Sequence, residues 1–266
     1  MNIRKTVVSG SFYPNDKDEL IDLINSFSKE INKKNQKYEN TFEHINAIIT
    51  PHAGYIYSGY LANVSFNLAS EQNPKRVIVI GPSHQAYFEG SSICLDDFYE
   101  TPLGNIKIDT DLSKEILQKY DFINQNEETA FEHSSETQAP FIKYYFPKAQ
   151  IIEIVYAKQD TNALCSLINE LILNKDNLIV ISSDLSHFHT LKDAKKLDEN
   201  CINAINQKDI NKLNTCEACG KIGISAILKS AIKNSLKTKV LDYATSFDIN
   251  NDRSSVVGYT TALIGK

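Results

Sequence analysis

The sequence predicts an α/β protein of three layers, in which helices cover both faces of a mostly parallel or mixed central sheet. Three short apolar runs carry this prediction: NAIITPHAGY at 46–55, RVIVIGPSHQ at 76–85 and NLIVISSDLSHFH at 177–189. Each run is rich in β-branched residues and is closed by Pro, Gly or Ser, which is typical of a strand buried on both faces. Helical spacing between the runs then favours helices layered on both sides of the sheet.

Local patterns predict the other elements. Asp16 is placed to cap a helix whose apolar residues share one face between 20 and 31. Ser135 with Gln138 resembles a capping box that opens a helix ending at Phe146. We expect further helices at about 60–68, 112–117, 161–174, 191–206 and 221–235, strands at 46–50, 77–80, 151–157, 178–182, 240–247 and 254–264, and a hairpin over 91–108.

Composition limits the class of protein. The polar stretch KKNQKYEN at 33–40 is predicted to be a surface loop and not a linker, so we expect one domain over 1–266. The net charge of −5 comes from interspersed charges, which argues against nucleic acid and against a membrane as partners. The opening MNIRKTVVSG has no apolar signal region, and the five cysteines are an odd number. We therefore expect free thiols and a cytoplasmic location.

The three apolar runs each end on a loop that bears a histidine. His52 follows the first run, His84 the second, and Asp184 with His187 the third. Ligands in open α/β sheets bind outside the carboxyl ends of the strands, so these side chains are predicted to converge on one crevice. A single histidine is more often structural, but two in equivalent positions favour a metal or acid–base site. His187 is the candidate acid–base group, and Asp184 is predicted to orient a histidine or the metal.

Two further segments contribute candidates. His133 stands just before a predicted helix, where the helix dipole is expected to keep its imidazole neutral. Cys219 also precedes a helix, so we expect a depressed pKa and a thiolate able to bind a soft metal. Its C-x-x-C spacing with Cys216 is also that of a dithiol redox pair, although such pairs usually follow the first strand of a thioredoxin-like unit. The other cysteines lie in apolar patterns and are predicted to be inert core residues: Cys94, Cys165 and Cys201.

As an ordered set, these motifs resemble the Memo-like proteins, which in microbes include the B component of the AmmeMemoRadiSam system. The resemblance rests on VSGSFYP at 8–14, PHAGY at 51–55, GPSH at 81–84, EHSSETQ at 132–138, SSDLSHF at 182–188 and the Cys219-Gly220 pair. It implies a fold similar to class III extradiol dioxygenases. It also implies a metal held by His52, His84 and Cys219, with Asp184, His187 and His133 in the same pocket.

The reaction is left open by these observations. A metal-dependent oxidoreductase is the leading hypothesis, with Fe(II) or Cu(I) as the expected ion and Zn(II) as a further candidate. The alternative is a non-catalytic protein that handles copper or binds a phosphopeptide, since the resemblance links the family to both. Zinc-dependent hydrolysis is the third hypothesis. The family name also suggests a radical SAM protein as partner, beside a small-molecule substrate of unknown class.

Overall fold

The structure is a computed structural model that describes residues 1–33, 38 and 42–266. The predicted surface loop at 33–40 lies almost entirely outside the described residues. The main sheet of the described part has eight strands, and their order across the sheet is β10 (Lys237–Thr245), β11 (Gly258–Gly265), β2 (Ile45–Thr50), β9 (Asn177–Ser182), β3 (Arg76–Pro82), β8 (Gln150–Tyr156), β4 (Ser91–Ile93) and β7 (Ile123–Asn124).

The middle of the sheet is parallel and its edges are mixed. β2, β9, β3 and β8 run parallel to one another. β11 pairs antiparallel with β2, β10 with β11, and β4 with β8. The predicted mixed α/β sheet is therefore confirmed, with its parallel strands at the centre.

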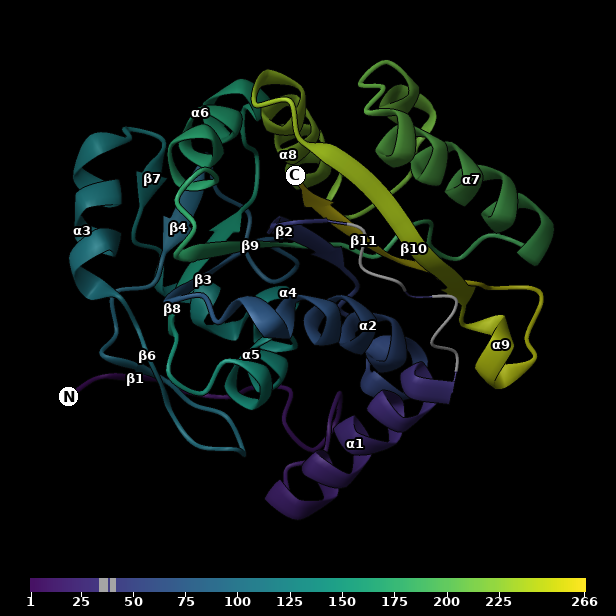
Figure 1. Cartoon of the computed structure of the whole chain (residues 1–266), viewed down its shortest axis with the longest axis horizontal. Helices are drawn as coiled ribbons and strands as arrows, with labels where there is room; N and C mark the ends of the chain where they lie inside the picture. Colours follow the sequence, from purple (N-terminus) through teal and green to yellow (C-terminus); the bar gives the residue numbers. More distant parts are fainter. Residues whose placement is uncertain (34–37, 39–41) are drawn as a thin grey trace.

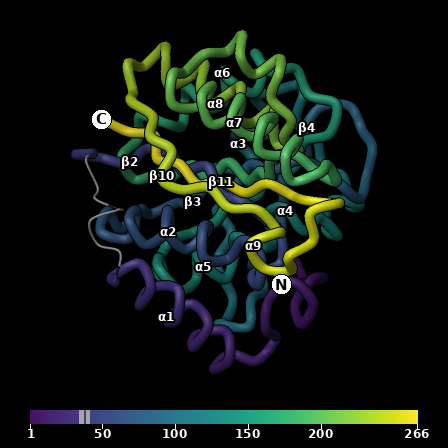
Figure 2. The backbone as a smooth tube through the Cα atoms, turned by 90° about the vertical axis from the view of Figure 1, so that its right-hand side faces the viewer, coloured from purple at the N-terminus to yellow at the C-terminus, as the bar shows by residue number. Residues whose placement is uncertain are grey.

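Two groups of helices cover the two faces of this sheet (Figure 1). Figure 2, turned by 90°, shows the same layers with the sheet between them. One group consists of α3 (Thr110–Lys119), α6 (Thr161–Leu171), α7 (Leu191–Gln207) and α8 (Lys221–Lys233). The other consists of α1 (Lys17–Lys33), α2 (Tyr60–Ala69) and α5 (Ala139–Tyr145). This is the three-layer arrangement expected from the resemblance to extradiol dioxygenases.

The apolar runs form strands because both of their faces are buried. In β3, Ile78 and Ile80 pack into the core beneath α6 and α8. Val77 and Val79 point the other way, into the core beneath α2 and α5. Alternate side chains of a strand face opposite sides of the sheet, so a sheet covered on both sides needs apolar residues at every position.

Short elements complete the chain. β1 (Ile3–Arg4), β5 (Phe98–Tyr99) and β6 (Ile106–Lys107) form a small second sheet, and the predicted hairpin between β5 and β6 turns at Gly104, whose φ is +109°. The remaining pieces are α4 (His133–Glu136), α9 (Phe247–Asn250), the π-helical turn η1 (Tyr55–Gly59) and the 3-10 turns η2 (Ser70–Gln72), η3 (Glu127–Phe131) and η4 (Lys212–Thr215).

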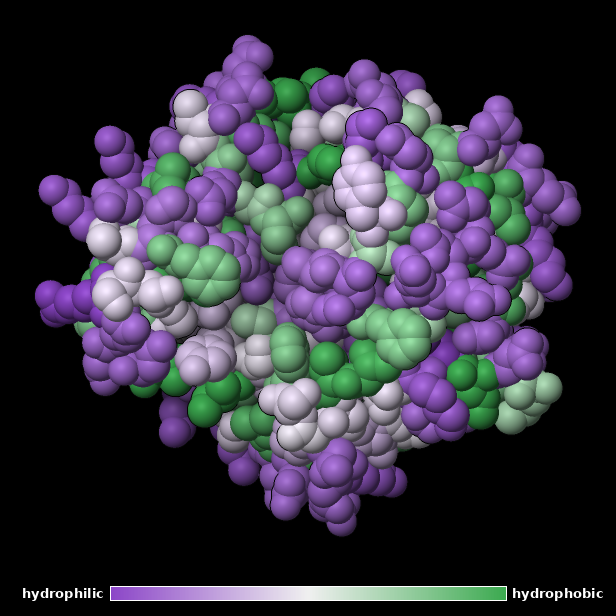
Figure 3. Space-filling model, turned by 180° about the vertical axis from the view of Figure 1, so that it is seen from behind, coloured by the Kyte–Doolittle hydropathy of each residue, from purple (hydrophilic) through white to green (hydrophobic). Residues whose placement is uncertain are grey.

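Within the described residues, no helix is long and apolar enough to cross a bilayer. On the face shown in Figure 3, apolar residues form separate patches among hydrophilic ones.

Candidate metal centre

Three neighbouring strands bring the predicted site residues together. β9 lies between β2 and β3 and is parallel to both, so the carboxyl ends of the three strands meet at one edge. His52 follows β2, His84 follows β3 and Asp184 follows β9, each two residues beyond the end of its strand. The predicted site residues therefore lie at the edge where ligands bind in open α/β sheets.

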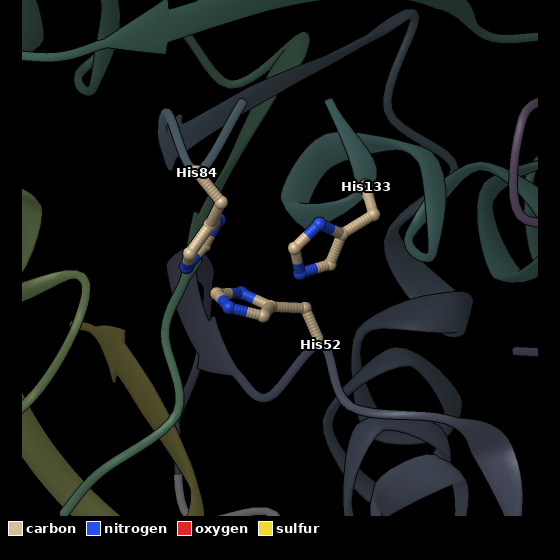
Figure 4. Close-up of side chains that lie close together, drawn as sticks. All are labelled: His52, His84 and His133. Atoms are coloured by element: carbon tan, nitrogen blue, oxygen red, sulfur yellow. The ribbon is translucent and has the colours of Figure 1, made fainter. Parts of the chain in front are cut away.

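The imidazoles of His52, His84 and His133 form a compact cluster and point toward one another (Figure 4). One ligand nitrogen from each lies within 4.8 Å of those of the other two. The ring centroids of His84 and His133 are 4.5 Å apart, and those of His52 and His84 are 5.2 Å apart. Within the described residues, these three histidines are the one group of three or more potential metal ligands whose ligand atoms all lie this close to one another. His133 is thus a neighbour of both predicted ligands.

A buried serine sets the tautomer of His52. The hydroxyl of Ser182 donates its single hydrogen to the carbonyl oxygen of Ser134, at 2.6 Å. It must therefore accept from its other partners, the amide of Gln138 at 3.0 Å and Nδ1 of His52 at 2.9 Å. Nδ1 of His52 carries the hydrogen, and the lone pair of Nε2 faces Sγ of Cys219 at 3.3 Å. Burial lowers the pKa of His52 well below its ordinary value, so the imidazole is neutral near pH 7.

The carboxylate of Glu132 orients His84 in a similar way. It accepts hydrogen bonds from Nδ1 of His84 at 2.9 Å and from the backbone N–H groups of His84 and Ser134 at 2.5 and 2.8 Å. Burial alone would raise the pKa of Glu132, but these bonds outweigh it and lower the pKa to about 2. An ionised carboxylate only accepts, so Nδ1 of His84 carries a hydrogen and Nε2 is the ring nitrogen left to bind a metal. Metal-binding histidines are commonly supported by such a carboxylate.

We expect Glu132→Gln to lower the affinity for a metal by roughly 10–100-fold, because the substituted amide offers a single acceptor oxygen and no charge to hold His84. The measurement is a competition titration of Zn(II) against a chelator. Glu128→Gln is the control, since it removes the same charge from an exposed position of the preceding turn. Equal affinities for the parent and Glu132→Gln would show that Glu132 does not support a metal ligand.

Cys219 contacts the imidazole of His52. Its Sγ is 3.3 Å from Nε2 of His52 and accepts a hydrogen bond from the backbone N–H of Asp184 at 3.2 Å. The expectation of a depressed thiol pKa is wrong: burial, followed by the charge of Asp184, raises the pKa of Cys219. A coordinating metal deprotonates a thiol outright, so a buried thiol that faces an imidazole lone pair fits a metal ligand.

Gly220 allows the start of α8 to approach β9. A Cβ at this position would meet the side chain of Ser183, with its Oγ at 2.6 Å, and the carbonyl oxygen of Ser182 at 2.7 Å. The backbone N–H of Gly220 instead donates to Oγ of Ser183 at 2.9 Å. The glycine therefore keeps Cys219 close to the loop that carries Asp184.

Asp184 contacts His52, and His187 interacts with both residues. Oδ1 of Asp184 accepts the backbone N–H of His52 at 2.8 Å, and its Oδ2 is 4.0 Å from Nε2 of that histidine. Burial raises the pKa of Asp184 against the opposing effect of this hydrogen bond. His187 is partly exposed and interacts electrostatically with both residues. One carboxylate oxygen of Asp184 thus contacts the backbone of His52 and the other faces its imidazole. His187 lies near enough to interact electrostatically with Asp184.

The amino-terminal segment closes the edge of the site. Phe12 packs against the ring of His133, with centroids 5.1 Å apart, and its carbonyl oxygen accepts the backbone N–H of Tyr55 at 2.7 Å. The backbone N–H groups of Val7 and Val8 both donate to the carboxylate of Glu136, in α4. These contacts explain why the VSGSFYP motif belongs with the histidine loops.

Cys216 is joined to Cys201 in a disulfide that links α7 to the segment before α8. The expectation of free thiols is therefore wrong for these two residues, whereas Cys94, Cys165 and Cys219 are free. The pairing also removes the dithiol interpretation of the C-x-x-C motif. Cys216 and Cys219 belong to different structural units, one a cross-link and one a residue of the site.

The model of the Memo-like protein family matches residues 4–263. The chain belongs to the Memo-like family. A MEMO1 family protein of Nitrosopumilus maritimus is 35% identical over 271 residues, which cover 97% of this chain and 98% of the relative. Another, of Aquifex aeolicus, is 33% identical over 274 residues, with coverage of 97% and 98%.

Sequence reasoning missed the supporting residues of this Memo-like site and assigned one motif wrongly. Ser135 and Gln138 do not form a capping box, because Ser135 donates to Glu153 and Gln138 donates to the carbonyl oxygen of Pro51 and to Ser182. The cap of α4 is Glu132, whose carboxylate accepts the backbone N–H of Ser134. An acidic residue directly before His133 was the available signal.

Proposed function

We propose that this Memo-like protein binds one transition-metal ion through His52, His84 and Cys219, and that the metal-loaded protein is an oxidoreductase. The observation that carries the proposal is the state of the two imidazoles. Each has its Nδ1–H engaged by a buried acceptor, Ser182 or Glu132, which leaves Nε2 of each ring as the nitrogen that would bind the metal. The thiol of Cys219, 3.3 Å from one of them, supplies a soft donor.

This donor set favours Fe(II) or Cu(I), with Zn(II) as a further candidate, because thiolate is a soft ligand and imidazole suits all three ions. A bound redox-active ion would supply electron transfer to a substrate. His133, within 4.8 Å of the two histidine ligands, is the competing third donor. Substitution of Cys219 and His133 separates the two assignments, as argued in the Discussion.

The chain's own residues would position and protonate the substrate. Asp184 fixes the loop of His52 through the backbone N–H and adds negative charge beside the ligands. His187 is the group suited to moving a proton, since it is partly exposed and its backbone is held by the carboxylate of Glu217 at 3.2 Å. An imidazole can take and return a proton near pH 7.

The test is turnover by metal-loaded protein, measured as consumption of oxygen in the presence of a reductant. We expect His187→Ala to keep its metal and to lose rate by about 100-fold or more, the usual contribution of a general acid or base. His44→Ala, at the opposite end of β2, is the control and should keep the parent rate. Absence of turnover in loaded parent protein, together with phosphopeptide binding or Cu(I) transfer, would contradict the oxidoreductase. Hydrolysis by the zinc form would contradict it as well.

A further inference from the structure

A cavity of about 240 Å³ is lined by residues other than those of the histidine cluster. Its walls come from β1, β8, the segment after β4 and the turn that leads to α4. Arg4 and Glu153 form its inner end, Asp96 and Glu127 are acidic residues of its wall, and Ile93 and Leu95 are apolar ones. None of the proposed metal ligands lines it.

The inner end of the cavity borders a buried charge cluster. Arg4, Glu136 and Glu153 are 1%, 0% and 3% exposed. Nη1 of Arg4 is 3.3 Å from a carboxylate oxygen of Glu136, and Nη2 is 3.6 Å from Oε1 of Glu153. One cation therefore faces two carboxylates. Burying charge is costly unless it is balanced, so this cluster favours a further positive charge beside it.

The hydrogen bonds show where that charge is needed. Glu136 accepts from Tyr13 at 2.8 Å, as well as from Arg4 and two backbone N–H groups. Glu153 uses Oε1 to accept from Tyr99 at 3.0 Å and from Ser135 at 2.5 Å. Among the described side chains, none donates to Oε2 of Glu153. The open acceptor therefore belongs to Glu153, the carboxylate that borders the cavity.

Arg4 has a hydrogen-bond donor that lacks an acceptor. Its Nη1 donates to the carboxylate of Glu136, and its Nη2 donates to the backbone carbonyl oxygen of Glu132 at 2.7 Å. Its Nε–H is buried and has no acceptor within the described part of the chain. Leaving a buried donor without a partner costs free energy, so an oxygen atom of a ligand would stabilise this end of the cavity.

We propose that this cavity binds a small molecule that carries both a primary ammonium group and an oxygen acceptor, such as a short amino acid. The ammonium group pairs with Glu153, within reach of the field of Asp96 and Glu127. The oxygen accepts from Arg4, and the carbon chain packs against Ile93 and Leu95. An inorganic cation would satisfy the carboxylates alone, whereas the cavity is several times larger than one water molecule and has an apolar wall.

Three probes of equal chain length test the proposal by isothermal titration calorimetry of the whole protein: β-alanine, propylamine and propionate. We expect β-alanine to bind best and propylamine to bind about ten-fold more weakly, because it lacks the oxygen for Arg4. Propionate and potassium ions should neither bind nor displace β-alanine. Displacement by potassium, binding of propionate alone, or failure of β-alanine and propylamine to bind would overturn the proposal.

Variants of the lining residues test whether β-alanine binds in this cavity. Glu153→Gln should abolish binding of β-alanine, and Asp96→Asn should weaken it. Because Glu153 is buried and its variant could fail to fold, Ala130→Met provides a second variant: Ala130 is exposed and lines the cavity, so a longer side chain blocks it. Glu115→Gln, on the exposed face of α3, is the control of equal charge change. Unchanged binding in Ala130→Met and Asp96→Asn would overturn the assignment.

Discussion

Replacing Cys219 by Ser is expected to lower the affinity for Zn(II) by more than about 100-fold, and the affinity for the softer Cu(I) by more still. A neutral hydroxyl is a poor substitute for a thiolate, and loss of a direct ligand should exceed the roughly 10–100-fold effect of losing a supporting residue. The measurement is an anaerobic competition titration with a chelator and without thiol reductant, so that the Cys201–Cys216 disulfide is kept.

His133→Ala is the matched variant for this experiment, because His133 is the other candidate for the third ligand. We expect a smaller loss of affinity in His133→Ala than in Cys219→Ser. The reverse order would show that the metal is held by three histidines and that the assignment of Cys219 is wrong.

The second large effect concerns stability. Cys216→Ser should lower the free energy of unfolding by about 3 kcal/mol, the amount expected for a cross-link that closes a loop of this length. Its affinity for metal should change little, because Cys216 is bound to Cys201 and not to the site. Denaturant unfolding of both proteins, with and without dithiothreitol, gives the comparison.

The reductant separates the disulfide from the other effects of the substitution. In dithiothreitol, the parent should lose a similar amount of stability and Cys216→Ser should lose none further. Equal unfolding free energies of parent and variant without reductant would contradict the cross-link.

The central strands could be predicted from sequence because their buried environment requires a simple residue pattern. Burial on both faces demands uninterrupted apolar residues, and β2, β3 and β9 were expected within a few residues of their observed ends. The order of the strands could not be predicted, since it depends on contacts between distant segments. That order matters, because insertion of β9 between β2 and β3 is what brings Asp184 beside His52.

The candidate site also contains residues that could be predicted from sequence and residues that could not. Residues directly after strands, such as His52 and His84, follow from the general behaviour of α/β sheets. Their supports do not, because Ser182 and Glu132 act through hydrogen bonds to residues distant in sequence. The pairing of Cys216 was missed for a related reason: the nearby Cys219 matched a local motif, whereas the true partner lies on α7.

The proposed ligand set is tested most directly by the X-ray absorption fine structure of protein loaded with one equivalent of Zn(II), recorded at the zinc edge. With His52, His84 and Cys219 as ligands, the spectrum should contain one sulfur neighbour at about 2.3 Å and nitrogen or oxygen neighbours at about 2.0–2.1 Å. A first shell made of nitrogen and oxygen alone would contradict the two-histidine, one-cysteine site.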